Sequence, residues 1–254
     1  MRIAYLSDAH WDFYLRNNLQ CLPKLPDDSE FDILVIAGDV ANGPQKTLEF
    51  VENIQKLTKN FVLYVPGNHC RYHSSFEEFN EILSKFNGYM NRKVFDYQDQ
   101  RFVCFTNWYP ILEDPKKMND YRWPDISWIG NGFPESVSEI DNEYHDDYRF
   151  LYDNLKEGDI VVSHFLPCDS MVQPKWVNSN TNAFYVSDKL NLIKQRKPKA
   201  WIFGHTHERF IKYENDCLFM CNPVGYPGEN PPFKFRIYDT EKDWLMANKE
   251  IENG

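Results

Sequence analysis

Five short apolar runs in this chain each end next to a residue type that binds metal ions, and this feature limits the possible folds most strongly. Each run has the length and composition of a buried β-strand. Asp, Asn or His follows every run within a few residues. The runs are residues 3–6, 33–37, 61–65, 160–162 and 200–203. Of the seven histidines, only His73 and His145 lie outside this pattern, so we expect the endings to form one site.

The spacing of apolar residues between these runs predicts an α/β fold. Residues 45–59 and 76–86 place apolar side chains at helical spacing, which is typical of amphipathic helices. Buried strands that alternate with such helices indicate βαβ units and a largely parallel sheet. The carboxyl ends of parallel strands meet at one edge of a sheet, where ligands bind in open α/β folds. We therefore expect the polar endings at that edge.

The stretch from about 107 to 140 breaks this pattern. It contains Trp108, Trp123 and Trp128 among prolines, glycines and acids, and it has no sustained period. Such a long irregular stretch is usually functional or disordered, and its aromatic content argues against disorder. We predict an ordered insertion that covers the site.

Regular structure is expected on both sides of this insertion, with no linker that divides the chain. One domain spanning 1–254 is therefore predicted. The expected elements are a strand at 101–106, helices at 144–155 and 185–195, and a closing, more antiparallel set of strands at 209–213, 218–221 and 234–238.

The composition argues against a membrane protein. Apolar residues make up 42% of the 254 residues, yet no apolar run approaches the roughly 18 residues of a membrane helix. Only four apolar residues stand between Arg2 and Ser7, too few for a secretory signal. We expect a protein that stays in the cytoplasm.

The cysteines and the net charge exclude further classes. The six cysteines lack paired zinc-finger spacing, so we expect reduced thiols. None has Arg six positions later, which excludes a cysteine-based phosphatase. The formal net charge of -10 argues against nonspecific nucleic-acid binding. A small phosphate substrate remains compatible with this charge, because bound divalent cations would dominate the local field.

Pairs of potential ligands stand two residues apart at two of the strand ends. Asp8 and His10 would lie on the same side of an extended segment, and so would His205 and His207. Each pair can therefore face one metal cluster. Asp39 directly follows a wholly apolar strand, where an unpaired carboxylate would be costly without a cation.

Each of these residues also has an ordinary structural explanation when it is taken alone. A single histidine at a strand end is more often hydrogen-bonded than metal-bound. Asp39 could cap the next helix, and Asn68 could shape a turn. Their joint occurrence in this order, all at strand ends, favours a metal site.

The order of the motifs resembles that of the calcineurin-like metallophosphoesterase superfamily. The matching pieces are Asp8-x-His10, Gly38-Asp39, Gly67-Asn68-His69, His164 and Gly204-His205-Thr206-His207. The resemblance implies an α/β fold in which two packed mixed β-sheets are flanked by helices, with two metal ions at the strand ends. It assigns Asp8, His10 and His207 to one metal and Asn68, His164 and His205 to the other, with Asp39 bridging them.

The resemblance also implies the chemistry. A hydroxide that bridges the two metals would attack the phosphorus of a phosphate ester. His69 is not a ligand in the family; it resembles the residue that protonates or stabilises the departing oxygen, a role that suits a side chain that changes charge near neutral pH. The mixed nitrogen and oxygen ligands favour manganese, iron or zinc over calcium.

Two residues depart from the family pattern, and one segment adds to it. Cys70 follows His69 where the family usually has an acid, so a carboxylate that supports the site is expected to be missing. Asn42 stands where related protein Ser/Thr phosphatases have Asp. The segment from Cys221 to Pro227 (Cys-Asn-Pro-Val-Gly-Tyr-Pro) resembles a bacterial and phage subgroup; it forms either a structural loop or a wall of the substrate site.

The substrate and the non-enzymatic alternatives stay open. We favour a phosphodiester over a phosphomonoester, because Asn42 weakens the protein-phosphatase alternative and the insertion could accommodate a second, nucleotide-like group. The tryptophans of the insertion could equally pack it against the protein. A P-loop is excluded because Pro44 stands where Lys is required. A non-catalytic scaffold that binds a protein partner is the alternative to an enzyme, but such members tend to lose ligands and all seven are present here.

Overall fold

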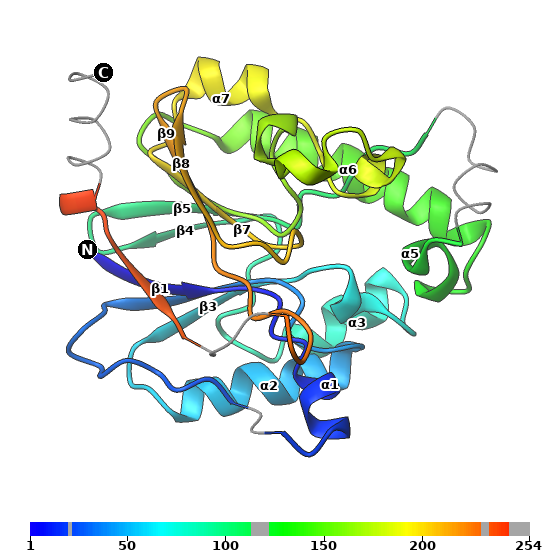
Figure 1. Ribbon diagram of the computed structural model, residues 1–254, viewed down its shortest axis with the longest axis horizontal. Coiled ribbons are helices and arrows are strands. Elements are labelled where there is room, and N and C mark those ends of the chain that lie inside the picture. The colour runs from blue at the N-terminus through cyan, green and yellow to red at the C-terminus, as the bar shows by residue number, and fades with distance from the viewer. Residues whose placement is uncertain (20–21, 113–121, 230–233, 244–254) are drawn as a thin grey trace.

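Two mixed β-sheets pack face to face, and helices cover their outer faces (Figure 1). The computed structural model describes residues 1–19, 22–112, 122–229 and 234–243. An apolar core between the sheets takes alternate residues from strands of both. In β2 (Ile33–Ala37), Val35 belongs to this core, while Ile36 belongs to the cluster under the helices. This arrangement confirms the predicted fold class.

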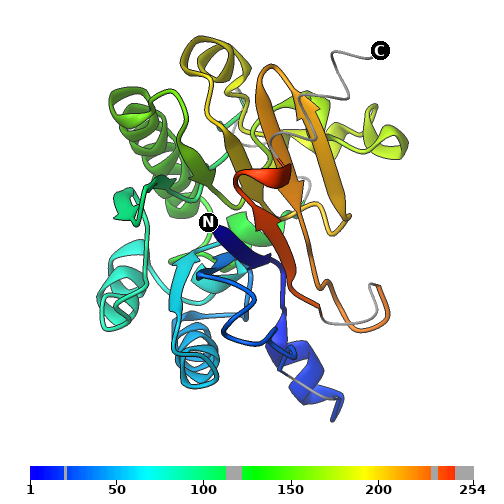
Figure 2. The same ribbon diagram turned by 90° about the vertical axis from the view of Figure 1, so that its left-hand side faces the viewer.

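The first sheet has a parallel centre formed by the first strands of the chain. β1 (Arg2–Leu6) and β3 (Phe61–Val65) flank β2 and run parallel to it. β10 (Arg236–Asp239) pairs with β1 in the antiparallel direction, so the strand order is β10-β1-β2-β3. Elements from both ends of the chain therefore lie side by side (Figure 2).

The second sheet also has a parallel centre, formed by β5 (Gln100–Cys104), β6 (Ile160–Val162), β7 (Ala200–Phe203) and β9 (Cys217–Cys221). β4 (Lys93–Tyr97) and β8 (Phe210–Glu214) close its edges in the antiparallel direction. The strand order is β4-β5-β6-β7-β9-β8.

Helices bury apolar side chains against the outer face of each sheet. Phe50 and Phe79 pack under the first sheet, and Leu151 and Ile193 pack over the second. The α-helices are α1 (Trp11–Arg16), α2 (Pro44–Lys56), α3 (Phe76–Leu83), α5 (Pro124–Trp128), α6 (Glu135–Asn154) and α7 (Leu190–Arg196), and the short 3-10 helices are η1 (His69–Arg71), η2 (Asp169–Met171), η3 (Pro174–Trp176) and η4 (Asn180–Phe184). Across the described ranges, no helix combines the length and apolar character needed to cross a membrane.

The five apolar runs are all strands, and α2 and α3 lie where helices were predicted. The sequence pattern does not predict α1, which has only six residues, too few to show a helical period. It also does not predict β4, an edge strand whose exposed positions are Lys93 and Asp96. The described cysteines Cys70, Cys104, Cys168, Cys217 and Cys221 are free thiols, while Cys21 lies outside the described residues.

The insertion is shorter than predicted, because α6 begins at Glu135. Its buried face includes Glu143 and Asp147, and these polar residues hide the apolar period from sequence analysis. The helix expected at 185–195 likewise begins only at Leu190. Residues 113–121 of the insertion lie outside the described residues. The described remainder is ordered around a buried aromatic cluster that includes Trp108.

Candidate metal centre

The carboxyl ends of strands from both sheets meet at one place. The backbone N–H of Asp8, after β1, donates to the carbonyl of Gly38, after β2, at 3.0 Å. His164, after β6, donates from Nδ1 to the carbonyl of Ala37 at 3.0 Å. The backbone N–H of His205, after β7, reaches both carboxylate oxygens of Asp8 at 3.0 and 3.1 Å. These bonds fix the strand endings of the two sheets against one another.

Two groups of potential metal ligands form at this junction. Within each group, one ligand atom of every residue lies within 4.8 Å of the others. In the first, His207 Nε2 is 3.0 Å from His10 Nε2 and 3.6 Å from Asp8 Oδ1. In the second, His164 Nε2 is 3.2 Å from Asp39 Oδ2. The first group is Asp8, His10 and His207, and the second is Asp39, His164 and His205.

Asn68 extends the second group through its side-chain oxygen. It lies in the turn after β3 and is buried. Its Oδ1 is 3.1 Å from His164 Nε2. All seven residues predicted as ligands therefore lie at the junction, and their role as ligands stays a prediction.

The chemistry of these side chains fits bound transition metals. His10 Nδ1 and His205 Nε2 are buried and have no hydrogen-bond partner within the described ranges, although such atoms normally find one. Imidazole nitrogens, carboxylate oxygens and an amide oxygen suit manganese, iron or zinc. The convergence of such atoms, with His205 Nε2 unpaired among them, is what an ion would explain.

Five of the proposed ligands have a left-handed backbone conformation. The φ angles of Asp8, His10, Asp39, His205 and His207 are 51°, 41°, 48°, 67° and 51°. The expectation that the two ligand pairs lie in extended segments is therefore wrong; tight left-handed bends turn both side chains of each pair toward the junction instead. Non-glycine residues in such conformations cost about 1–3 kcal/mol each and concentrate at functional sites.

Two glycines leave room for ligand side chains. A Cβ atom added at Gly67 would overlap the carboxylate of Asp39. At Gly38, whose φ is 87°, an added Cβ would overlap the imidazole of His164. These two glycines thus let the backbone approach the side chains of proposed ligands closely.

The buried charges of the second group stabilise one another. Burial would raise the pKa of Asp39, but the neighbouring histidines, the charged His164 most of all, outweigh this effect and hold that pKa well below its usual range. Burial would lower the pKa of His164, but Asp39 raises it to about 9. Burial lowers the pKa of His10 and of His205, so these rings are neutral and have lone pairs for a metal. A cation at this junction could replace the proton that His164 provides.

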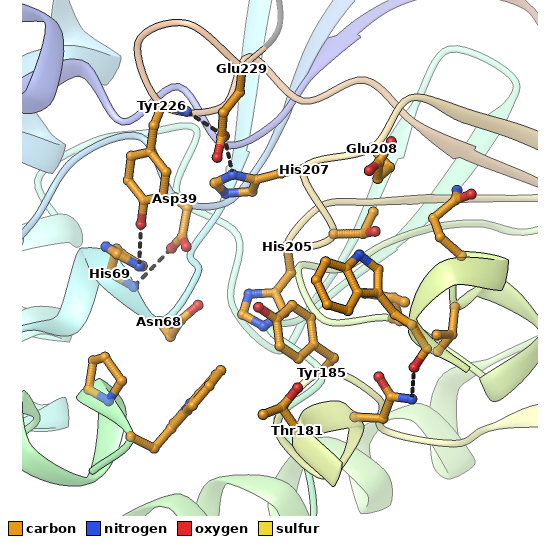
Figure 3. A pocket seen from close by; sticks show the side chains of 18 of the residues that line it. Asp39, Asn68, His69, Thr181, Tyr185, His205, His207, Glu208, Tyr226 and Glu229 are labelled. Atoms are coloured by element: carbon orange, nitrogen blue, oxygen red, sulfur yellow. Dashed lines mark hydrogen bonds and ion pairs between the residues drawn. The ribbon is translucent and has the colours of Figure 1, made fainter. Parts of the chain in front are cut away.

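His69 borders the junction but belongs to neither group. Its backbone N–H donates to Asp39 Oδ1 at 2.9 Å, and its ring Nδ1 is 2.8 Å from the amide oxygen of Asn42. That oxygen can only accept, so Nδ1 carries the hydrogen and Nε2 faces the hydroxyl of Tyr226 at 3.3 Å (Figure 3). His69 is thus placed to exchange a proton at Nε2.

Sequence analysis missed two carboxylates that support the ligands. Glu229 Oε2 accepts from His207 Nδ1 at 2.7 Å and from the backbone N–H of Tyr226 at 2.8 Å (Figure 3). Asp125 accepts from the amide nitrogen of Asn68 at 2.8 Å. The segment from Cys221 to Pro227 was the only signal, since it points to the loop that contains Tyr226. Nothing in the residue pattern distinguishes Asp125 from the other acids of the insertion.

Cys70, which stands where the family usually has an acid, does not supply a negative charge in its place. Its Sγ lies 3.9 Å from Asp39 Oδ1, and burial raises the pKa of the thiol, which stays neutral.

A cavity of about 690 Å³ opens onto both ligand groups. Its lining includes Trp123 and Trp176, and also Tyr185, whose ring lies 4.4 Å from that of His205 (Figure 3). Of the three tryptophans considered in the insertion, only Trp123 lines it, and its ring stacks on Phe184 at 4.5 Å. Trp108 is fully buried, whereas Trp128 stacks on a histidine outside the cavity.

Comparisons with known proteins agree with this geometry. Residues 1–209 match the model of the calcineurin-like phosphoesterase family. Uncharacterized protein L509 of Acanthamoeba polyphaga mimivirus is 27% identical over 98% of this chain and all of its own length. Phosphopantetheinyl hydrolase of Mycobacterium tuberculosis has a similar fold, with a TM-score of 0.67, 16% identity and coverage of 93% of this chain and 95% of its own. A dimetal phosphatase of Danio rerio gives a TM-score of 0.50 at 14% identity, over 93% and 91% of the two chains.

Proposed function

Because the chain belongs to the calcineurin-like phosphoesterase family, we propose that it is a binuclear metal enzyme that cleaves a phosphodiester carrying a nucleotide-like group. Metal-dependent hydrolysis of a phosphate ester follows from membership of the family. The finer proposal depends on one observation above all. Both ligand groups open onto one cavity of about 690 Å³ whose lining includes Trp123, Trp176 and Tyr185.

The proposed ligands divide between two metal positions. Asp8, His10 and His207 would hold one ion, and Asn68, His164 and His205 the other. Asp39 would bridge the two: its carboxylate lies 3.2 Å from His164 Nε2, and its backbone carbonyl accepts from the backbone N–H of His10 at 3.0 Å. Ions held in this way would activate water and neutralise charge on the phosphoryl oxygens.

His69 is the proposed general acid. The N–H at Nδ1 of His69 donates to the amide oxygen of Asn42. When the ring is protonated, its second N–H is therefore at Nε2, and the residue lines the cavity. From there it can donate to the oxygen that leaves phosphorus. The Tyr226 hydroxyl, 3.3 Å away, would keep the ring in this orientation.

The wall of the cavity that contains Trp176 supports the choice of substrate. Trp176 lines the cavity with a side chain that is 53% exposed, so its ring is available for stacking. A base stacked on such a ring gains about 1–3 kcal/mol. A bare phosphomonoester would leave this wall without contacts. A diester would place one substituent there and the other on the opposite side of phosphorus.

Two alternatives remain to be compared with this proposal. A non-catalytic scaffold does not require all seven proposed ligands, yet all seven lie at the junction. A protein Ser/Thr phosphatase is disfavoured by Asn42, which contacts His69 where an acid was expected for that class. The similarity to a bacterial and phage subgroup rests on the loop motif alone and stays a prediction.

Reconstitution with manganese, iron or zinc tests the proposal. We expect two ions per chain, and faster hydrolysis of bis(para-nitrophenyl) phosphate than of para-nitrophenyl phosphate. Less than one ion per chain, together with no turnover of either ester, would contradict it. Natural substrates would then be compared among cyclic nucleotides, dinucleotides, phosphoproteins and a phosphopantetheinyl ester, the last suggested by the name of a protein with the same fold. Turnover of phosphoproteins alone would favour the protein-phosphatase alternative.

A further inference from the structure

Asp125, on α5 of the insertion, is a fully buried carboxylate beside the metal centre. Its Oδ1 accepts hydrogen bonds from Tyr72 Oη at 2.7 Å and from Asn68 Nδ2 at 2.8 Å. Its Oδ2 accepts from Tyr109 Oη at 3.0 Å and from Trp123 Nε1 at 3.2 Å. The carboxylate thus joins the insertion to the turn that contains a proposed metal ligand.

The bond to Asp125 determines which end of the Asn68 amide faces the metal centre. An ionised carboxylate only accepts hydrogen bonds, so the amide NH2 of Asn68 must point toward it. The same NH2 donates to Tyr72 Oη at 3.1 Å. The amide oxygen consequently faces His164 Nε2, 3.1 Å away in the second ligand group. Only this oxygen has lone pairs with which the side chain can bind a metal.

We propose that Asp125 is a positioning residue that holds the amide oxygen of Asn68 toward the second metal position. The insertion would thereby control the affinity of that position. This inference rests on the proposed role of Asn68 as a metal ligand. Hydrogen-bond partners that orient ligands typically change metal affinity by about 10- to 100-fold.

The first test compares two variants that disturb the same carboxylate differently. Asp125→Ala removes the acceptor of the Asn68 amide, whereas Tyr109→Phe removes one donor on Oδ2 and leaves that amide untouched. Binding of Mn²⁺ to the metal-depleted full-length chain is followed by calorimetry, and urea unfolding reports stability. We expect Asp125→Ala to weaken one of the two metal positions by about 10- to 100-fold. Tyr109→Phe should lower stability without this selective loss.

A second substitution distinguishes orientation from general loosening. Asn68→Asp replaces the amide with a carboxylate, whose two oxygens are equivalent. Either orientation of residue 68 then presents an oxygen to the metal position, and no hydrogen-bond partner is needed to fix it. Combined with Asp125→Ala, it should restore most of the lost affinity. Alone, it would place two carboxylates where one hydrogen bond now lies, and should weaken metal binding.

Several outcomes would overturn the inference. Equal affinity losses in Asp125→Ala and Tyr109→Phe would show a merely structural role, and so would a double variant that binds no better than Asp125→Ala. If Asp125→Ala does not fold, Asp125→Leu replaces it, because a leucine side chain fills the site and also removes the acceptor of the Asn68 amide; wild-type affinity in that variant contradicts the inference. If the wild-type chain binds two ions and the Asp125 variants bind them with the same affinity, this inference is refuted but the proposed function is not. A wild-type chain that binds no ions would refute the proposed function itself.

Discussion

His69 is the residue whose proposed role depends least on metal binding. Its backbone is bonded to Asp39, and its ring is held between Asn42 and Tyr226. His69 belongs to neither ligand group, so its imidazole ring can be removed without removing a proposed metal ligand. Proton transfer and metal binding should therefore separate at this position.

Replacing His69 with Ala should lower kcat by about 100-fold or more while the metal content stays nearly unchanged. The physical reason is the loss of a proton donor without the loss of a ligand. His145→Ala, at an exposed position on α6, is the matched control and should leave kcat unchanged. Elemental analysis and steady-state kinetics measure both quantities. A loss of metal in His69→Ala would show instead that the residue is a ligand.

Gly67→Ala should disrupt the second metal position. The added methyl group would overlap the Asp39 carboxylate, so the turn or that carboxylate must move. Gly158→Ala is a useful control, because nothing lies near the added atom there and its only expected cost comes from a φ of 82°, which disfavours a side chain. We expect weaker metal binding only in Gly67→Ala, as measured by calorimetry. Equal metal affinity in both variants would contradict the assignment of Asp39.

The identity of the junction residues was predictable, but their conformations and partners were not. A ligand type after a buried strand is visible in sequence. The left-handed bends at Asp8 and His205 are not, since they depend on bonds between different loops. Asp125 and Glu229 were missed because their partners are 57 and 22 residues away along the chain. Only the folded arrangement gives these acids a role.

At the scale of elements, loops supply most of the proposed site. The loop after β9 begins beyond residue 209, where the family match ends, yet it braces the site. Asn222 accepts from Ser7 N at 3.1 Å, and Gly225 N donates to the Asp8 carbonyl at 2.8 Å. Tyr226 contacts His69 from the same loop. The segment is therefore a structural loop that braces the end of β1, and its role as a wall of the substrate site stays a prediction, supported by Tyr226 in the lining of the cavity.

The short helix η3 contributes Trp176 to the lining of the cavity, and Trp176→Ala tests the role of this ring. We expect KM for a nucleotide diester to rise about 5- to 100-fold, from the loss of one stacking contact. The kcat for a small aryl ester should change little, since the ring is not a proposed ligand. Trp128→Ala is the matched control: its ring is 45% exposed, against 53% for Trp176, but it does not line the cavity. Equal KM values in the two variants would argue against the proposed base-binding wall.

At the scale of the whole molecule, the proposed ligands come from both sheets. Asp8, Asp39 and Asn68 follow strands of the first sheet, and His164 and His205 follow strands of the second. The apolar runs alone predicted one largely parallel sheet. A strand that is buried on both faces has the same apolar sequence pattern whether the protein contains one sheet or two. The division into two sheets was expected only from the family resemblance. Metal ions at this junction would link the two sheets.

Metal removal should consequently destabilise the fold. An ion present at 100 times its Kd adds about 2.7 kcal/mol to the free energy of unfolding per site, provided that it does not bind the unfolded chain. We therefore expect chelation to lower Tm and re-addition of metal to raise it again in a concentration-dependent way. Asp39→Asn should have a much smaller metal-dependent shift, since it weakens the residue proposed to bridge both ions. Calorimetry with and without chelator that gave identical Tm values would contradict a structural link through metal.

Electron paramagnetic resonance of the manganese-loaded chain tests whether two metal ions lie side by side, bridged by Asp39. We expect the spectrum of two exchange-coupled ions in the wild type, and its loss in Asp39→Asn. A wild-type spectrum of isolated manganese ions, at full metal loading, would contradict this arrangement.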